Sequence, residues 1–213
     1  MALLNAHVKT RRYDGSRRQD QARQRQQAVL DAAESLFFEL GYTATTITRI
    51  AAAAGVSPET VYKSFGGKPG LVKALRARAL LGVGDVPAEH RSDRLRDLAD
   101  PHEVVRGWAR LATEVAPRVA PVLLLVREAA VVDVELRELF DELDADRHRR
   151  MHANARALAR SGHLRSGVSL AMATDVMFAV SSPEMYDLLV VRGRWSLRRY
   201  ARFVETTIAS ALL

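Results

Sequence analysis

The stretch TTITRIAAAAGVSPETVYKSF, residues 45–65, decides the fold of this chain. Its apolar residues recur at helical spacing on both sides of Gly55. Thr46 and Ser57 are each placed to act as the N-cap of a short helix, and Pro58 takes a first-turn position that needs no N–H donor. The stretch therefore predicts two short helices, 47–54 and 58–65, joined by a sharp turn at Gly55.

This layout is that of a helix-turn-helix. Gly55 permits the bend, Val56 fills the angle between the helices, and the second helix projects its polar side outward. Such a helix fits the DNA major groove, where hydroxyl and ammonium groups donate to phosphates or base edges. The polar positions are Ser57, Glu59, Thr60, Tyr62, Lys63 and Ser64. Glu59 has two interpretations, because it can complement the helix dipole or accept a bond from a cytosine amine.

The rest of the chain also predicts helices. A core-facing stripe from Val29 to Leu40 precedes the motif, and residues 69–81 form a linking helix after it. Residues 89–97 are too charged to predict an ordered element. Pro117 is expected to end a helix that begins at Pro101. Further helices are expected from 121, from 133 as one long helix or a pair, and over 170–180, 183–191 and 197–212.

Composition agrees with a globular chain. The 213 residues are 48% hydrophobic and 27% charged, with a net charge of +7 and no cysteine, which excludes disulfides and thiolate metal sites. The apolar run 121–126 is far shorter than the roughly 18 residues of a membrane span, and the N-terminus lacks an apolar signal core. We therefore expect a cytoplasmic protein without a membrane partner.

Positive charge gathers at the N-terminus, where residues 1–25 hold seven basic residues against two acidic ones. A basic arm indicates nucleic acid or another anionic surface, and the alternative is a solvated tail without a partner. The expected organisation is a flexible basic arm over 1–22, a DNA-binding domain over 23–68, and an effector-binding and dimerisation domain over 69–213.

Residues 45–65, followed by Lys68 and Leu71, resemble the DNA-binding domain of TetR-type transcriptional regulators. The turn glycine, the cap serine, the Thr-x-Tyr pair, the closing phenylalanine and the following lysine all stand at the family's spacing. The chain departs from the family at Glu59, where a small residue is usual, and at Gly67-Lys68-Pro69. Parts of the C-terminal run, such as Arg192-Gly193-x-Trp195-Ser196, also resemble the ligand-binding half of such proteins.

The resemblance implies an all-α fold, with a three-helix DNA-binding domain joined to a C-terminal helical ligand-binding and dimerisation bundle. It also implies roles for single residues. Phosphates would be held by Thr46, Tyr62 and Lys68. The groove would be lined by Thr48, Arg49, Ser57, Glu59, Thr60 and Lys63.

Other chemistry is weakly indicated. The sequence has no Gly-x-Ser-x-Gly elbow, no His-Glu-x-x-His and no glycine-rich phosphate loop, so we expect neither an enzyme nor a cofactor. His148 and His152 are four residues apart and could share a metal, but the neighbouring arginines at 147, 149 and 150 oppose a cation. No metal site is expected.

An effector site is expected in the C-terminal part. Glu128 and Asp175 lie in apolar surroundings and are candidates for buried carboxylates, either structural or in contact with an effector. Methionines and aromatic residues at helical spacing could line a cavity or be ordinary core. The full candidate set is Trp108, Leu111, Leu124, Glu128, Met151, Ala155, Met172, Asp175, Met177 and Phe178.

These expectations combine into one function: a regulator, a repressor in its simplest form, that binds a palindromic double-stranded operator as a homodimer through residues 169–212. A small apolar or amphipathic effector, unknown from the sequence, would release it. The alternatives are an all-α enzyme or carrier of an apolar molecule without specific DNA binding, and an architectural protein that binds DNA without sequence preference.

Overall fold

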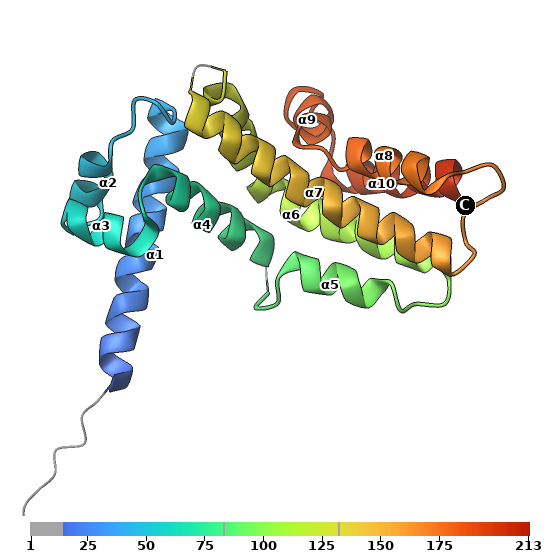
Figure 1. The fold of residues 1–213 in the computed structure, drawn as a ribbon, viewed down its shortest axis with the longest axis horizontal. Helices are drawn as coiled ribbons and strands as arrows, with labels where there is room; N and C mark the ends of the chain where they lie inside the picture. The colour runs from blue at the N-terminus through green and yellow to red at the C-terminus, as the bar shows by residue number, and fades with distance from the viewer. Residues whose placement is uncertain (1–14, 83, 132) are drawn as a thin grey trace, which may run out of the picture.

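The structure is a computed structural model that describes residues 15–82, 84–131 and 133–213, and within these ranges it consists of helices and loops without a β-strand (Figure 1). The first four helices are α1 (Gly15–Leu40), α2 (Ile47–Ala53), α3 (Pro58–Phe65) and α4 (Lys68–Leu81). They are followed by α5 (Ala88–Leu95), α6 (Pro101–Ala129), α7 (Val134–Arg160) and α8 (Leu170–Val180). The chain ends with α9 (Pro183–Tyr186), the π-helix η1 (Asp187–Arg192) and α10 (Leu197–Leu212).

One hydrophobic core, here called the N-terminal core, joins α1–α4 to one end of the α6–α7 pair. Phe37, Ile50 and Val61 from α1, α2 and α3 are fully buried in it. Leu71 from α4 and Val126 from α6 belong to the same cluster. The short helices α2 and α3 therefore rest on α1 and α4, and α4 packs on α6, which extends with α7 to one side of the four helices (Figure 1).

A second cluster, the C-terminal core, is built from α6, α7, α8 and α10. Trp108, Met177 and Tyr200 are among its buried residues. In Figure 1 α8 and α10 lie at the end of the molecule away from α1–α3. The fold is all-α, as the sequence predicts, with the helix-turn-helix segment at one end.

The prediction that Pro117 ends a helix is wrong, because α6 runs through both Pro117 and Pro121. A proline inside a helix removes one backbone hydrogen bond and costs about 3 kcal/mol. Buried residues on both sides of the prolines, such as Ala109 and Val122, pack into the two cores. This packing offsets the cost and keeps the helix continuous.

Two more segments differ from the sequence expectation. The charged stretch after residue 88 forms α5, with Ala88 and Ser92 buried on its inner side. Residues 15–22, which the sequence places in the flexible arm, belong to α1, where glutamine and arginine are good helix formers. Residues 1–14 of the expected arm lie outside the described residues. The long segment after 133 is a single helix, α7.

Candidate nucleic-acid interface and internal cavity

A side-chain cap stands at the start of each helix of the motif, Thr46 before α2 and Ser57 before α3. The hydroxyl of Thr46 accepts from the backbone N–H of Arg49 at 3.2 Å, and the hydroxyl of Ser57 accepts from that of Thr60 at 3.3 Å. Gly55 has φ +65°, a left-handed conformation that a side chain at this position would strain. These local interactions produce the predicted helix-turn-helix.

Packing decides which side of α3 faces outward. Val61 is fully buried and Phe65 half-buried, so the opposite side of the helix is free. Tyr62 is 57% exposed, although it is a large aromatic residue. The other predicted contact residues of the motif are also accessible: Thr46, Thr48, Arg49, Ser57, Glu59 and Lys63 are exposed, and Thr60 is half-buried. Apart from Glu59, these residues carry hydroxyl or cationic groups, and they belong to α2, α3 and their N-caps.

Glu59 lies in the first turn of α3 and is fully exposed. Its own backbone N–H and the Ser57 side chain lower the pKa of its carboxyl group. The carboxylate is therefore charged at the positive end of the helix dipole, as the dipole interpretation expects. The Glu59 side chain remains exposed to solvent.

Lys68 is the predicted phosphate contact whose surroundings differ most from expectation. Its ammonium group donates to the carbonyl oxygens of Tyr42 at 2.8 Å and Thr45 at 2.9 Å, and it lies 4.2 Å from the centre of the Tyr42 ring. Burial lowers the pKa of the Lys68 ammonium. Its main contacts thus tie the start of α4 to the loop between α1 and α2.

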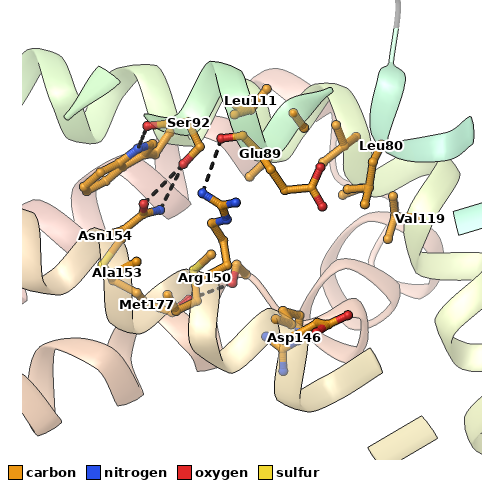
Figure 2. A pocket seen from close by; sticks show the side chains of 18 of the residues that line it. Leu80, Glu89, Ser92, Leu111, Val119, Asp146, Arg150, Ala153, Asn154 and Met177 are labelled. Carbon is orange, nitrogen blue, oxygen red and sulfur yellow. Dashed lines mark hydrogen bonds between the residues drawn. The ribbon is translucent and has the colours of Figure 1, made fainter. Parts of the chain in front are cut away.

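The second candidate site is a cavity of about 850 Å³ between the helices of the C-terminal part (Figure 2). Arg76 and Leu80 of α4 form part of its wall. The remaining lining comes from α5, α6, α7, α8, α9 and α10. Its apolar lining includes Leu111, Val115, Val119, Met177, Val204 and Ile208.

A buried hydrogen-bond network forms one end of the cavity. The indole N–H of Trp108 donates to the backbone oxygen of Ser92 at 3.3 Å. Asn154 donates to the Ser92 hydroxyl at 3.2 Å and accepts from Nε of Arg96 at 2.8 Å. These contacts fix α5 against α6 and α7 (Figure 2).

The predicted effector residues separate into two groups. Trp108, Leu111, Met151 and Met177 line the cavity. Ala155 is buried in the C-terminal core beside it, and Leu124 is half-buried on α6. Neither lines the cavity.

The others lie elsewhere. The expectation of buried carboxylates at Glu128 and Asp175 is wrong for the single chain, because both side chains are exposed on outward faces of α6 and α8. Met172 is 44% exposed. Phe178 packs outside the cavity against the Arg147 guanidinium, which lies 3.5 Å from the ring centre.

Sequence reasoning missed the polar lining at Glu89, Ser92, Arg150 and Asn154. Asn154 carried a usable signal, since it stands next to Ala155 within the apolar stripe of α7, where a polar residue needs a partner. The α5 residues carried none, because the stretch is charged on most of its positions.

The histidines and the long helices are the candidates for a metal site and for a membrane span. No group of three or more metal-binding side chains occurs among the described residues. His148 packs edge-on against Phe178, and Nδ1 of His152 lies 3.4 Å from the Thr174 hydroxyl. Within the same part of the chain, none of the helices combines the length and the apolar character of a membrane span.

Comparison with known proteins shows what the helix-turn-helix segment is similar to. Residues 29–75 match the sequence profile of bacterial regulatory proteins of the tetR family. The uncharacterized HTH-type transcriptional regulator YvkB of Bacillus subtilis is 39% identical over 70 residues, which make up 33% of this chain and 37% of YvkB. The match thus spans little more than a third of the length of that relative.

Solved structures extend the likeness to nearly the whole chain. SmeT, solved as a complex with triclosan, is 23% identical with a TM-score of 0.72, over 90% of this chain and 92% of SmeT. NalD, the secondary repressor of the MexAB-OprM multidrug efflux pump in Pseudomonas aeruginosa, is 22% identical with a TM-score of 0.69, over 92% and 98%. At these identities the likeness shows the fold. The likeness to the tetR family in sequence is therefore that of residues 29–75, and the likeness in fold extends over about nine tenths of the chain.

Proposed function

We propose that the chain is a homodimeric transcriptional regulator, acting as a repressor, that binds a palindromic DNA operator and is released by a small effector. The observation that carries the proposal is the outward side of α3, where Tyr62 and Lys63 are exposed while Val61 anchors the helix. A helix held at one face and rich in hydrogen-bond donors on the other suits the major groove.

Specific binding needs two copies of this helix. Each recognition helix reaches only a few base pairs, and each mismatch costs about 1–3 kcal/mol, so one half-site is too weakly discriminated in a genome. Two-fold pairing would place two α3 helices on successive major grooves, about 34–36 Å apart. Functional units of 23–68 for DNA and 69–213 for pairing and effector binding are part of this proposal.

The proposed pairing surface lies within residues 169–212. Large apolar side chains are exposed there in the single chain: Met172 at 44%, Leu188 at 50%, Val191 at 58% and Leu197 at 42%. Large apolar side chains exposed to solvent favour a protein contact. A second copy covering α8, η1 and α10 would remove them from water.

Helix α4 provides a route between the two sites. Leu71 and Leu75 of α4 are buried in the N-terminal core, whereas Arg76 and Leu80 line the cavity. An effector that prefers a different position of α4 would change the spacing of the two α3 helices and shift the population toward release. Because the coupling is reciprocal, operator DNA must weaken effector binding by the same factor.

Selection of bound sequences from random DNA at physiological salt, with the oligomeric state measured alongside, tests the proposal. We expect a palindromic consensus and a dimer. In the same assay Lys63→Ala should weaken binding about tenfold and change the sequence preference. Lys73→Ala is the matched control, because Lys73 is an exposed lysine of α4 that pairs with Glu142 at 2.7 Å. Sequence-blind binding, or a stable monomer that binds DNA equally well, would overturn the proposal.

A further inference from the structure

The cavity contains one carboxylate that the rest of the chain does not use. Glu89 lies in the first turn of α5 and is half-buried. Figure 2 shows its carboxylate directed into the open space, toward Leu80 and Val119, and away from the polar network at Ser92. In the ranges that the structure describes, no hydrogen bond or ion pair joins this carboxylate to another side chain.

The arginines of the lining differ from Glu89, because each pairs with a carboxylate of the chain, although Nη2 of Arg96 is buried without a hydrogen-bond partner among the described residues. Arg96 and Arg150 both pair with Asp93, and Arg150 also donates to the backbone oxygen of Glu89. Arg76 and Arg149 both pair with Asp146. Arg147 pairs with Asp144 and stacks on Phe178 outside the cavity. Except at Nη2 of Arg96, an anionic ligand would have to compete with these carboxylates for the guanidinium groups.

The two observations together favour a positively charged ligand. On the basis of the effector site in the proposed function, we propose that the cavity binds an amphipathic organic cation, with its ammonium group beside the Glu89 carboxylate and its apolar body along Leu111 and Val119. The ammonium would supply the partner that Glu89 lacks. The cavity volume of about 850 Å³ lies in the range of sites for small organic molecules.

The arginine-rich rim sets the size of the expected preference. The lining holds more arginines than acidic residues, which opposes a cation at longer range. Charges separated by more than about 8 Å are largely screened at physiological salt when solvent reaches them. A direct ion contact with Glu89, inside a cavity with apolar walls, is screened much less. The preference should therefore depend on Glu89 and change little when salt is raised.

The test uses three ligands with the same eight-carbon chain: octyltrimethylammonium, 1-octanol and octanoate. Binding to the full chain without DNA is measured by titration calorimetry. We expect octyltrimethylammonium to bind about tenfold more tightly than 1-octanol, through the Coulomb attraction to the Glu89 carboxylate, and octanoate to bind no better than 1-octanol. Equal affinity for the three, or tighter binding of octanoate, would overturn the inference.

Two variants assign the preference to one residue. Glu89→Gln keeps the shape of the side chain and should bring octyltrimethylammonium to the affinity of 1-octanol. Glu103→Gln is the matched control, because Glu103 lies in the first turn of α6, is exposed, and does not line the cavity. A preference that survives Glu89→Gln, in protein with an unchanged unfolding midpoint, would place the cation elsewhere and contradict the inference.

Operator release is measured separately, so the two proposals can fail independently. Binding of octyltrimethylammonium that depends on Glu89 but leaves DNA affinity unchanged supports the ligand class and contradicts the effector role of the cavity. Operator release by octanoate alone supports an effector site and contradicts the ligand class.

Discussion

The N-terminal and C-terminal cores use the same kinds of residue and differ in how they are filled. In the N-terminal core, Phe37 of α1, Ile50 of α2 and Leu71 of α4 are fully buried in one cluster. None of the buried residues of this core lines the cavity. Six buried residues of the C-terminal core do line it: Trp108, Ala120, Met177, Tyr200, Val204 and Ile208.

This difference corresponds to two tasks. A closely packed core transmits strain and allows little repacking, so it fixes the orientation of α3. A core that surrounds an open space has fewer contacts across it and can take several arrangements. The comparison teaches that the chain is rigid where it is proposed to meet DNA and adaptable where it is proposed to bind an effector. Measurements of stability can test this division directly.

The largest expected effect is the loss of the Phe37 ring from the N-terminal core. Phe37 is fully buried and stacks on Tyr42 with ring centres 5.2 Å apart. Phe37→Ala should lower the free energy of unfolding by about 3–5 kcal/mol, through lost transfer energy and the cavity left behind. Denaturant unfolding measures the loss. Phe38→Ala is the control, because the neighbouring ring is 47% exposed; equal midpoints for the two variants would contradict the close packing of this core.

The next effect concerns Tyr200 at the wall of the cavity. Burial, together with the nearby Tyr186, raises the pKa of Tyr200 to about 12. A phenol whose pKa is raised on folding favours the folded state below pH 10, and this contribution is lost as the pH rises from 10 to about 12. The loss for one group with this shift is about 2–3 kcal/mol.

Tyr200→Phe should therefore flatten the fall in unfolding free energy between pH 10 and 12. Chemical unfolding at several alkaline pH values, in the wild type and in the variant, measures the difference. Tyr186→Phe is the natural comparison, because burial also raises the pKa of Tyr186 and the two rings pack edge-on. Identical pH profiles for the wild type and Tyr200→Phe would show that water reaches the hydroxyl freely in the folded chain.

The parts of the fold that depend on local signals could be predicted from the sequence, and the parts that depend on distant packing could not. The helix-turn-helix depends on local signals, since Thr46 and Ser57 cap the helices that follow them and Gly55 takes a left-handed turn. Local signals of this kind can be read from a sequence. The continuation of α6 through Pro117 could not, because the packing that keeps it helical comes from residues distant in the chain.

The candidate sites show the same limit. The accessible residues of α3 follow from helical spacing alone, and their roles on DNA remain a prediction. Lys68 could not be assigned from spacing, since its two carbonyl partners lie 26 and 23 residues earlier in the chain. The polar lining of the cavity depends on α5, whose charged residues resemble a solvated surface until α6 and α7 are placed beside them.

The smallest effect gives the sharpest test of the comparison, because the same substitution is made in the N-terminal core and at the wall of the cavity. Ala33 is fully buried in the N-terminal core, and Ala112 lines the cavity. Ala33→Leu adds three carbons where no space is open, and overpacking of this kind costs about 1–3 kcal/mol. Ala112→Leu can place the same atoms in the cavity, so we expect the free energy of unfolding to stay unchanged or to rise slightly.

The two leucines should also differ in what they do to binding. Ala112→Leu reduces the space for a ligand and should weaken the binding of octyltrimethylammonium measured by calorimetry, while DNA affinity in the absence of ligand stays the same. Ala33→Leu should instead weaken DNA binding, since α1 carries the helix-turn-helix on its inner face. If Ala112→Leu destabilises the chain as much as Ala33→Leu does, the space between α6 and α7 closes in solution, and the two cores are equally filled.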